Sequence, residues 1–317
     1  MKTQFLIAVT CLAVLATGCC ADKPQPKAGH VVFVGIDGLA SWCLEQALDG
    51  TATLSGEAVE IPHIRQMMEG GAYTLRKRSV MPSASAINWA SIFNGVPTEM
   101  HGYNAWNSRK PAIPAAETGI NGMPTTVYTL LRAQRPEAVS GAQYNWDGIG
   151  YVIDTLAASW HRFDPTVHRD PAYTSAAYTA RALEYLASAG PAFFTLYYDE
   201  LDAAGHGTGW GSDTYYSVLE ELDACIGQLM DGLREAGIWD DTLLVLSSDH
   251  GGKDRGHGGF TIEELEAPFI VYGKPVKSTG AITRTMMQYD VAANFAYMLG
   301  LDIPDHWRGR PFPEIFE

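Results

Sequence analysis

Short runs of apolar and β-branched residues recur along the chain, and segments of helical periodicity separate them. Continuous apolar runs bounded by glycine or polar residues are typical of strands buried on both faces of a parallel sheet. Five such strands are predicted, at residues 30–37, 138–143, 192–198, 242–248 and 268–272. Helices, with apolar residues every three or four positions, are predicted at 61–69, 87–93, 125–133, 175–189 and 213–236. This alternation predicts an α/β fold with three layers (αβα) and a mostly parallel, doubly wound central sheet.

The same pattern indicates how the chain is divided. No internal repeat and no Pro/Gly/Ser-rich linker interrupts residues 30–317, so we expect these residues to form a single catalytic domain. The least regular stretch, residues 103–122, contains Trp106 and several Pro and Gly breakers. We expect it to form a long surface loop, of the kind that often walls a substrate pocket.

The N-terminus has the pattern of an export signal. Lys2 precedes an apolar run at 5–16, which suits a signal peptide but is too short to span a bilayer. The run leads into Leu-Ala-Thr-Gly-Cys at 15–19, which resembles a bacterial lipoprotein box, although Ala16 stands where Leu is usual. Residues 1–18 are thus a predicted signal peptide, Cys19 a predicted lipid site and 19–29 a tether. The expected location is the bacterial cell envelope, periplasmic or outer, with membrane contact only through this anchor; ordinary cleavage and release is the alternative.

The net charge of the chain argues against one class of binding partner, duplex nucleic acid. The chain has 22 Lys plus Arg against 36 Asp plus Glu, a net charge of −14, so no general field attracts duplex nucleic acid. The densest basic cluster, Arg76 to Arg78, is interpreted as a solvated strand edge. A small anionic substrate would need a local cation, such as a metal ion, to attract it.

Cysteine usage excludes a structural zinc module, because no CxxC or Cys/His finger spacing occurs. Cys43 and Cys225 are expected to be buried, unlinked thiols, with a disulfide between them as the alternative.

Polar residues that follow the predicted strands carry the candidate chemistry. In an open parallel sheet the ligand crevice lies beyond the carboxyl ends of the strands. Imidazole and carboxylate without thiolate are the ligands of catalytic Zn²⁺, or of Mn²⁺ or Fe²⁺, and six ligands suffice for three on each of two ions. Taken singly, each of the candidate residues could be a helix N-cap or an ordinary surface histidine. Because all of them follow strands at the same sheet edge, a metal centre is favoured. The six candidates are Asp37, Asp202, His206, Asp249, His250 and His257.

A candidate nucleophile lies where an extended segment becomes a helix. Ser85 and Asn88 fall in or beside the predicted first helical turn, where free backbone N–H groups favour an oxyanion. A serine hydroxyl needs a base or a metal to take its proton, and a nearby dication supplies that. Ser83 is expected to be an ordinary N-cap.

Taken in order, the blocks VGIDGL, MPSASAINWASIFNGVPTEMHGY, DELDAAGH, SSDHGG and GHGG resemble the alkaline phosphatase superfamily, and most closely its nucleotide pyrophosphatase/phosphodiesterase branch. The resemblance implies an alkaline-phosphatase-like fold and two divalent ions, with zinc the expected metal. It assigns one ion to Asp202, His206 and His257, and the other to Asp37, Asp249 and His250 with Ser85 facing it. Asn88 would donate its amide to a phosphoryl oxygen. Ser85 and Ile87 stand where the branch usually has Thr and Pro, which leaves the exact branch open.

The resulting hypothesis is two-metal hydrolysis of a small phosphodiester or nucleotide pyrophosphate through a phosphoseryl intermediate. No Arg or Lys occurs in 83–106, which favours diesters, because a monoester's second charge calls for an extra cation. The expected substrate wall consists of Trp89, Tyr103, Trp106, Tyr144 and Trp146. The alternatives are a phosphomonoesterase, a sulfatase-like hydrolase (although the C/S-x-P-x-R segment is absent) and a non-catalytic surface-binding lipoprotein. The sequence does not address oligomeric state.

Overall fold

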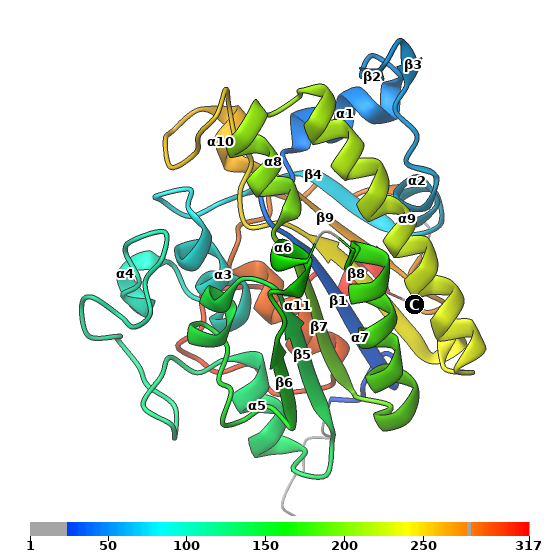
Figure 1. Cartoon of the computed structure of the whole chain (residues 1–317). Helices are drawn as coiled ribbons and strands as arrows, with labels where there is room; N and C mark the ends of the chain where they lie inside the picture. Colours follow the sequence, from blue (N-terminus) through cyan, green and yellow to red (C-terminus); the bar gives the residue numbers. More distant parts are fainter. Residues whose placement is uncertain (1–23, 171, 278–279, 317) are drawn as a thin grey trace, which may run out of the picture.

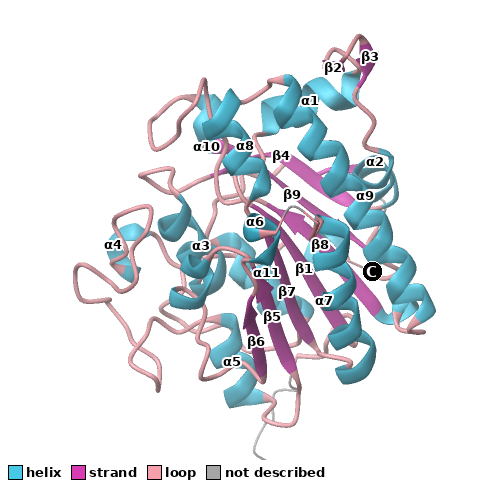
Figure 2. Ribbon diagram, viewed as in Figure 1, coloured by secondary structure: helices cyan, strands magenta, loops and turns pink. Residues whose placement is uncertain are grey.

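The computed structural model describes residues 24–170, 172–277 and 280–316. Within them, one eight-stranded sheet runs through the centre of the molecule with helices on both sides (Figures 1 and 2). The strand order is β10-β4-β9-β8-β1-β7-β5-β6. The strands are β1 (His30–Ile36), β4 (Ala72–Arg78), β5 (Ser140–Tyr144), β6 (Trp160–Phe163), β7 (Phe193–Tyr198), β8 (Thr242–Ser247), β9 (Glu266–Tyr272) and β10 (Gly280–Ala281). A separate hairpin joins β2 (Thr53–Leu54) to β3 (Glu57–Ala58).

The three-layer fold confirms the predicted fold class. Strands β8, β1, β7, β5 and β6 run parallel to one another, and β10 runs parallel to β4. Strand β9 is antiparallel to both β4 and β8. Its apolar sequence predicted a buried strand but carried no information on direction, because direction depends on which neighbours it pairs with.

Helices cover the sheet on both faces, because side chains along each central strand alternate between the two. In β1, Val31 and Phe33 pack with α3, α5 and α11, whereas Val32 and Val34 pack with α1, α2, α7 and α9. The helices are α1 (Ser41–Asp49), α2 (Pro62–Gly70), α3 (Ser85–Asn94), α4 (Thr98–His101), α5 (Val127–Gln134), α6 (Thr166–Arg169), α7 (Ser175–Ala189), α8 (Glu200–Thr208), α9 (Asp213–Glu235), α10 (Ile262–Leu265) and α11 (Asp290–Met298). Short 3₁₀ helices are η1 (Asp147–Tyr151), η2 (Trp239–Asp241) and η3 (Pro313–Ile315).

The basic cluster at 76–78 corrects one prediction. It belongs to β4, a strand with neighbours on both sides rather than an edge. Arg76 is largely exposed and pairs with Glu45 and Glu266, but Lys77 is completely buried. The alternation of a strand sends the middle residue of three to the opposite face, so the cluster is not one solvated surface.

The irregular loop and the two buried cysteines agree with the predictions made from the sequence. Residues 103–122 form the expected long irregular loop, apart from turns and bends. Cys43 and Cys225 are both buried and unlinked, as predicted. The predicted signal peptide, Cys19 and the first part of the tether lie outside the described residues. Within the described part of the chain, no helix is both long and apolar enough to cross a bilayer.

Candidate active site

The six candidate ligands reach one edge of the sheet from different elements. Asp37 directly follows β1, and Asp249 and His250 follow β8, which pairs with β1. Asp202 and His206 lie on α8, just after β7, on β1's other side. They are one helical turn apart, which places both on the same helix face. His257 comes from the loop between β8 and α10. The parallel order of these strands is what brings the residues together.

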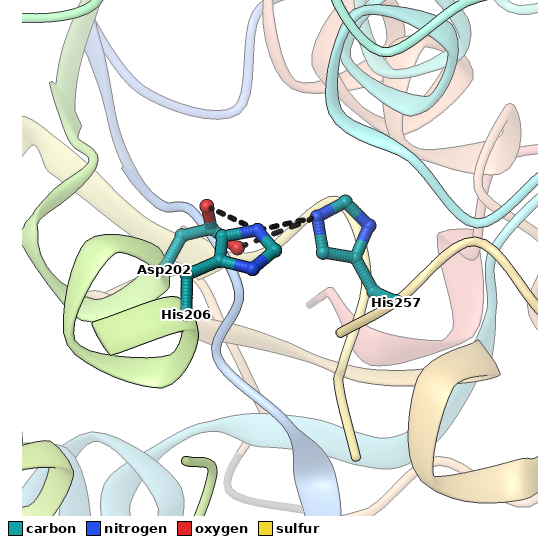
Figure 3. Close-up of side chains that lie close together, drawn as sticks. All are labelled: Asp202, His206 and His257. Carbon is teal, nitrogen blue, oxygen red and sulfur yellow. Dashed lines mark hydrogen bonds and ion pairs between the residues drawn. The ribbon is translucent and has the colours of Figure 1, made fainter. Parts of the chain in front are cut away.

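Asp202, His206 and His257 form one cluster, shown in Figure 3. The Nε2 atoms of the two histidines lie 3.1 Å apart. Asp202 Oδ2 lies 3.4 Å from His206 Nε2, and Asp202 Oδ1 lies 3.7 Å from His257 Nε2. Three ligand atoms therefore converge from α8 and the 251–261 loop on one point.

A second cluster centres on His250 Nε2. Asp249 Oδ2 lies 3.0 Å from this nitrogen, and Asp37 Oδ1 lies 3.5 Å from it. Ser85 Oγ lies 3.3 Å from it, so the serine faces the cluster from the first residue of α3. Asp37, Asp202 and His250 also bring ligand atoms within reach of one ion, so Asp202 lies between the two clusters.

Three buried carboxylate oxygens in these clusters accept no hydrogen bond as long as the histidine Nε2 atoms carry no proton: Asp37 Oδ1, Asp202 Oδ1 and Asp249 Oδ2. Burying an acceptor without a partner is costly, and burying a charge without one costs more. Divalent cations would satisfy all three oxygens, so the donor set fits the pair of metal ions that the sequence suggested.

The three histidines are oriented for metal binding by backbone carbonyl groups. Nδ1 of His206 contacts the carbonyl of Arg255 at 3.0 Å, Nδ1 of His250 that of Gly251 at 2.8 Å, and Nδ1 of His257 that of Ser83 at 2.9 Å. Because a carbonyl only accepts, Nδ1 carries the proton in each ring, and in the neutral ring Nε2 keeps a lone pair. This arrangement is typical of metal-ligating histidines.

Asp37 is held by two aromatic side chains. Trp89 Nε1 donates to Asp37 Oδ2 at 2.8 Å, and Tyr197 Oη donates to the same oxygen at 2.5 Å. The other oxygen is thereby aimed at His250. The chain can turn here because Gly38 adopts φ +68°, and a Cβ at Gly38 would come within 3.0 Å of the Asp202 backbone.

Burial and like charges shift the pKa values of the cluster. The pKa of Asp37 is raised by burial and by the charges of Asp249 and Asp202. Burial raises the pKa of Asp202 to about 6. Burial opposes protonation of His250, but Asp249 and Asp37 outweigh it and raise the pKa of His250 to about 10. Burial, with the nearby His250, lowers the pKa of His257 to about 3. Without cations, the crowded and buried carboxylates favour protonation of Asp37, Asp202 and His250.

A cavity of about 560 Å³ opens onto Ser85, Asp37, Asp202, His206 and His257. Trp106 and Trp146 line it, as expected of the substrate wall. The wall needs a correction at Trp89, Tyr103 and Tyr144, which are buried and are not among its lining residues. Their aromatic side chains fill the core below the site. Large rings bury more apolar surface there than they would at the cavity wall.

Asn88 and Ser83 also differ from expectation. Asn88 is completely buried: its Nδ2 donates to the carbonyls of Val80, Pro82 and Ala84, and its Oδ1 accepts from Val80 N. Its amide holds the loop that precedes Ser85, and Asn88 is not among the residues that line the cavity. Ser83 does not cap α3: its Oγ donates to Gly259 O and accepts from Gly258 N.

Three residues at the site were not selected from the sequence. Tyr197 orients Asp37, and Asn104 and Asp199 line the cavity. Asp199 could have been found as the first polar residue after β7, and Asn104 as a polar neighbour of Tyr103 and Trp106. No sequence signal distinguished Tyr197 from the other aromatic residues of its strand.

The chain is similar to a known protein family over most of its length. A family model described as type I phosphodiesterase / nucleotide pyrophosphatase matches residues 31–269. A bis(5'-adenosyl)-triphosphatase from Bos taurus is 24% identical over 245 residues, covering 75% of this chain and 50% of that protein. The chain therefore spans about half the length of that curated relative.

Solved structures share the fold at low sequence identity. The murine ectonucleotide pyrophosphatase/phosphodiesterase 5 superposes with a TM-score of 0.68 at 16% identity, covering 91% of this chain and 100% of that one. An inactive variant of the same murine protein has been solved in complex with AMP. A phosphonate monoester hydrolase from Silicibacter pomeroyi gives a TM-score of 0.66 at 17% identity, covering 90% of this chain and 76% of that one. The fold is thus that of alkaline-phosphatase-like hydrolases, and it is shared by enzymes with different substrates.

Proposed function

Because this chain belongs to the type I phosphodiesterase / nucleotide pyrophosphatase family, we propose that it hydrolyses phosphodiester or pyrophosphate bonds of small, nucleotide-type substrates, with Ser85 as the nucleophile. The observation that carries the proposal is the convergence of buried oxygens of Asp37 and Asp249 and of Ser85 Oγ around His250 Nε2, with Asp202 beside them. Structural packing alone gives no reason to bury such a group of charges.

Two divalent ions fit the side chains present. Asp202, His206 and His257 would hold one ion. Asp37, Asp249 and His250 would hold the other, and Asp202 also lies within reach of it. Carboxylate and imidazole donors make zinc the expected metal. When bound, the ions would supply Lewis acidity that lowers the pKa of a hydroxyl and offsets charge on the departing oxygen.

Ser85 carries the covalent step. Its Oγ loses its proton to solvent and forms a bond to phosphorus. The bond from phosphorus to the leaving oxygen breaks at the same time, and that oxygen takes up a proton from solvent. Water then cleaves the phosphoseryl ester, which restores the Ser85 hydroxyl and releases the phosphate product. Trp89 and Tyr197 keep Asp37 in place throughout, and Asn88 fixes the loop that sets the position of Ser85.

The decisive experiment is Ser85→Ala. Turnover of bis(p-nitrophenyl) phosphate should fall by at least about a thousandfold, because the nucleophile is lost. Metal content, measured by mass spectrometry of the purified protein, should stay at the wild-type value. Turnover close to that of wild type would exclude Ser85 as the nucleophile.

Diesters and nucleotides are the proposed substrates because of the cavity lining. None of the described residues that line it is Lys or Arg, while Trp106 and Trp146 offer faces for an aromatic ester group or base. The AMP complex of the murine relative supports a nucleotide-type ligand. Rates on bis(p-nitrophenyl) phosphate and on the p-nitrophenyl ester of thymidine 5'-phosphate should exceed those on p-nitrophenyl phosphate and p-nitrophenyl sulfate. Preference for the monoester or the sulfate would contradict this proposal.

We propose further that the protein is an exported bacterial envelope lipoprotein. The support is the sequence alone: the apolar run at 5–16 and the lipoprotein-like box ending at Cys19. Cells grown with labelled palmitate should label the wild-type protein and not Cys19→Ala. Absence of label in the wild type would leave cleavage and release as the explanation.

A further inference from the structure

The backbone that carries Asp249 and His250 leaves the sheet at the end of β8. Its carbonyl groups at Ser248 and Asp249 lie inside the protein and need donors there. Side chains supply them. Lys77 Nζ donates to Ser248 O at 2.6 Å, Ser79 Oγ donates to Asp249 O at 2.7 Å, and Gln288 Nε2 donates to Asp249 O at 2.9 Å.

Lys77 is unusual among these donors because it is a charged residue whose side chain is completely buried. Its Nζ also donates to Gln288 Oε1, so the two long side chains hold each other as well as the turn. Burying an ammonium group is costly, and an apolar residue could fill the same volume. Lys77 does not line the cavity and so has no direct contact with a substrate there.

The three donors link parts of the fold that are not adjacent. Lys77 and Ser79 come from β4 and the residue after it, Gln288 precedes α11, and β9 separates β4 from β8. The chain then runs from Ser79 through the loop that Asn88 holds to Ser85. The segment that leads to Ser85 therefore also donates hydrogen bonds to the turn that carries Asp249 and His250.

We propose that Lys77, Ser79 and Gln288 act as positioning residues, a brace that fixes the Asp249–His250 turn so that its side chains can bind a divalent ion beside Ser85. The inference rests on the proposed two-metal function. None of the three residues is assigned a contact with substrate.

Removing Lys77 should change the affinity for a divalent cation in opposite directions, depending on whether the residue acts through its charge or by positioning the turn. If Lys77 acted only through its charge, its loss would strengthen binding of a cation nearby, because a like charge has been removed. If it positions the turn, its loss weakens binding. Changes to groups that orient metal ligands typically cost about 10–100-fold in metal affinity.

The experiment titrates metal-free protein with Zn²⁺ alone, by competition with a chelating dye. Measurements are made in the wild-type background and in His206→Ala, which disables the Asp202/His206/His257 cluster. Lys77→Met should weaken Zn²⁺ binding in the His206→Ala background by at least about tenfold. The matched control is Arg76→Met, which removes one positive charge from the exposed face of the same strand and should leave affinity unchanged.

Unchanged or tighter binding in Lys77→Met overturns the brace, and so does equal weakening of both ions, which would indicate general loosening. If Lys77→Met does not fold, Ser79→Ala decides: loss of one hydroxyl should weaken the same ion by at least about threefold, and unchanged affinity rejects the proposal. A wild-type protein that binds no pair of Zn²⁺ ions would instead reject the proposed function. The two failures are therefore distinguishable.

Discussion

His206 and His257 present their Nε2 atoms to each other at 3.1 Å, although each ring already uses its Nδ1 proton on a backbone carbonyl. Two facing lone pairs repel unless a proton or a cation lies between them. The pKa of His257 is lowered to about 3, so a proton is not readily held on that ring. A metal ion at this point would remove the repulsion and would also satisfy the nearby Asp202 carboxylate.

Metal removal should therefore destabilise the protein. We expect treatment with a chelator to lower the melting temperature by at least several degrees, because ions that bind only the folded state stabilise it. Zn²⁺ added back should restore the original value, as measured by differential scanning calorimetry. Equal melting temperatures with and without chelator would mean that the folded protein holds no such ions.

Asn88→Ala should act mainly through stability. The change removes hydrogen bonds to Val80, Pro82 and Ala84 inside the protein and leaves their partners buried. We expect a loss of about 2–4 kcal/mol in the free energy of unfolding, measured with urea. Wild-type stability combined with lost turnover would restore Asn88 to the substrate-binding role that the sequence suggested.

Trp106→Ala should weaken substrate binding without affecting the fold. The Trp106 side chain lines the cavity, and the residue is 58% exposed, so little packing is lost. We expect KM for an aromatic diester to rise about 5–30-fold, equivalent to about 1–2 kcal/mol of aromatic contact, with kcat changed much less. Phe260→Ala is the matched control, because Phe260 is 81% exposed and is not among the lining residues. Equal KM values for both variants would remove Trp106 from the wall.

His101 should contribute to acid sensitivity. It is buried between Ser91 and Tyr103, and burial lowers the pKa of His101 to about 3, against an ordinary value of 6.5. Between these values the unfolded chain binds a proton that the folded chain does not, so stability present above pH 6.5 is lost as the pH falls toward 3.

His101→Gln removes this titration. Between pH 6.5 and pH 4, the wild type should lose more unfolding free energy than the variant, by on the order of 3 kcal/mol. Urea unfolding at a series of pH values measures the difference. Parallel pH profiles for the two proteins would show that His101 does not take up its proton on unfolding.

Much of the site could be predicted from local sequence. Asp37, Asp249 and His250 directly follow apolar runs, and residues at the ends of parallel strands must meet at one sheet edge. Asp202 and His206 have the spacing of one helix face, and Ser85 begins a helix. These features depend on period and order along the chain, which the sequence contains.

The roles of single side chains were less accessible. Trp89 and Trp106 are both large aromatic residues near Ser85 in the sequence. Trp89 is buried and donates a hydrogen bond to Asp37, whereas Trp106 lines the cavity. Asn88 had the right chemistry for a phosphoryl contact but turns back onto its own loop. Lys77 lies between two arginines and is buried, while Arg76 is solvated.

Sequence alone thus determined the α/β alternation and the set of groups that could bind metal, because apolar period and residue chemistry are local properties. Tertiary structure decided the antiparallel direction of β9, the burial of Lys77 and the choice of aromatic residues that line the cavity. These depend on which neighbours a side chain meets after folding, and on whether a buried polar group finds a partner there.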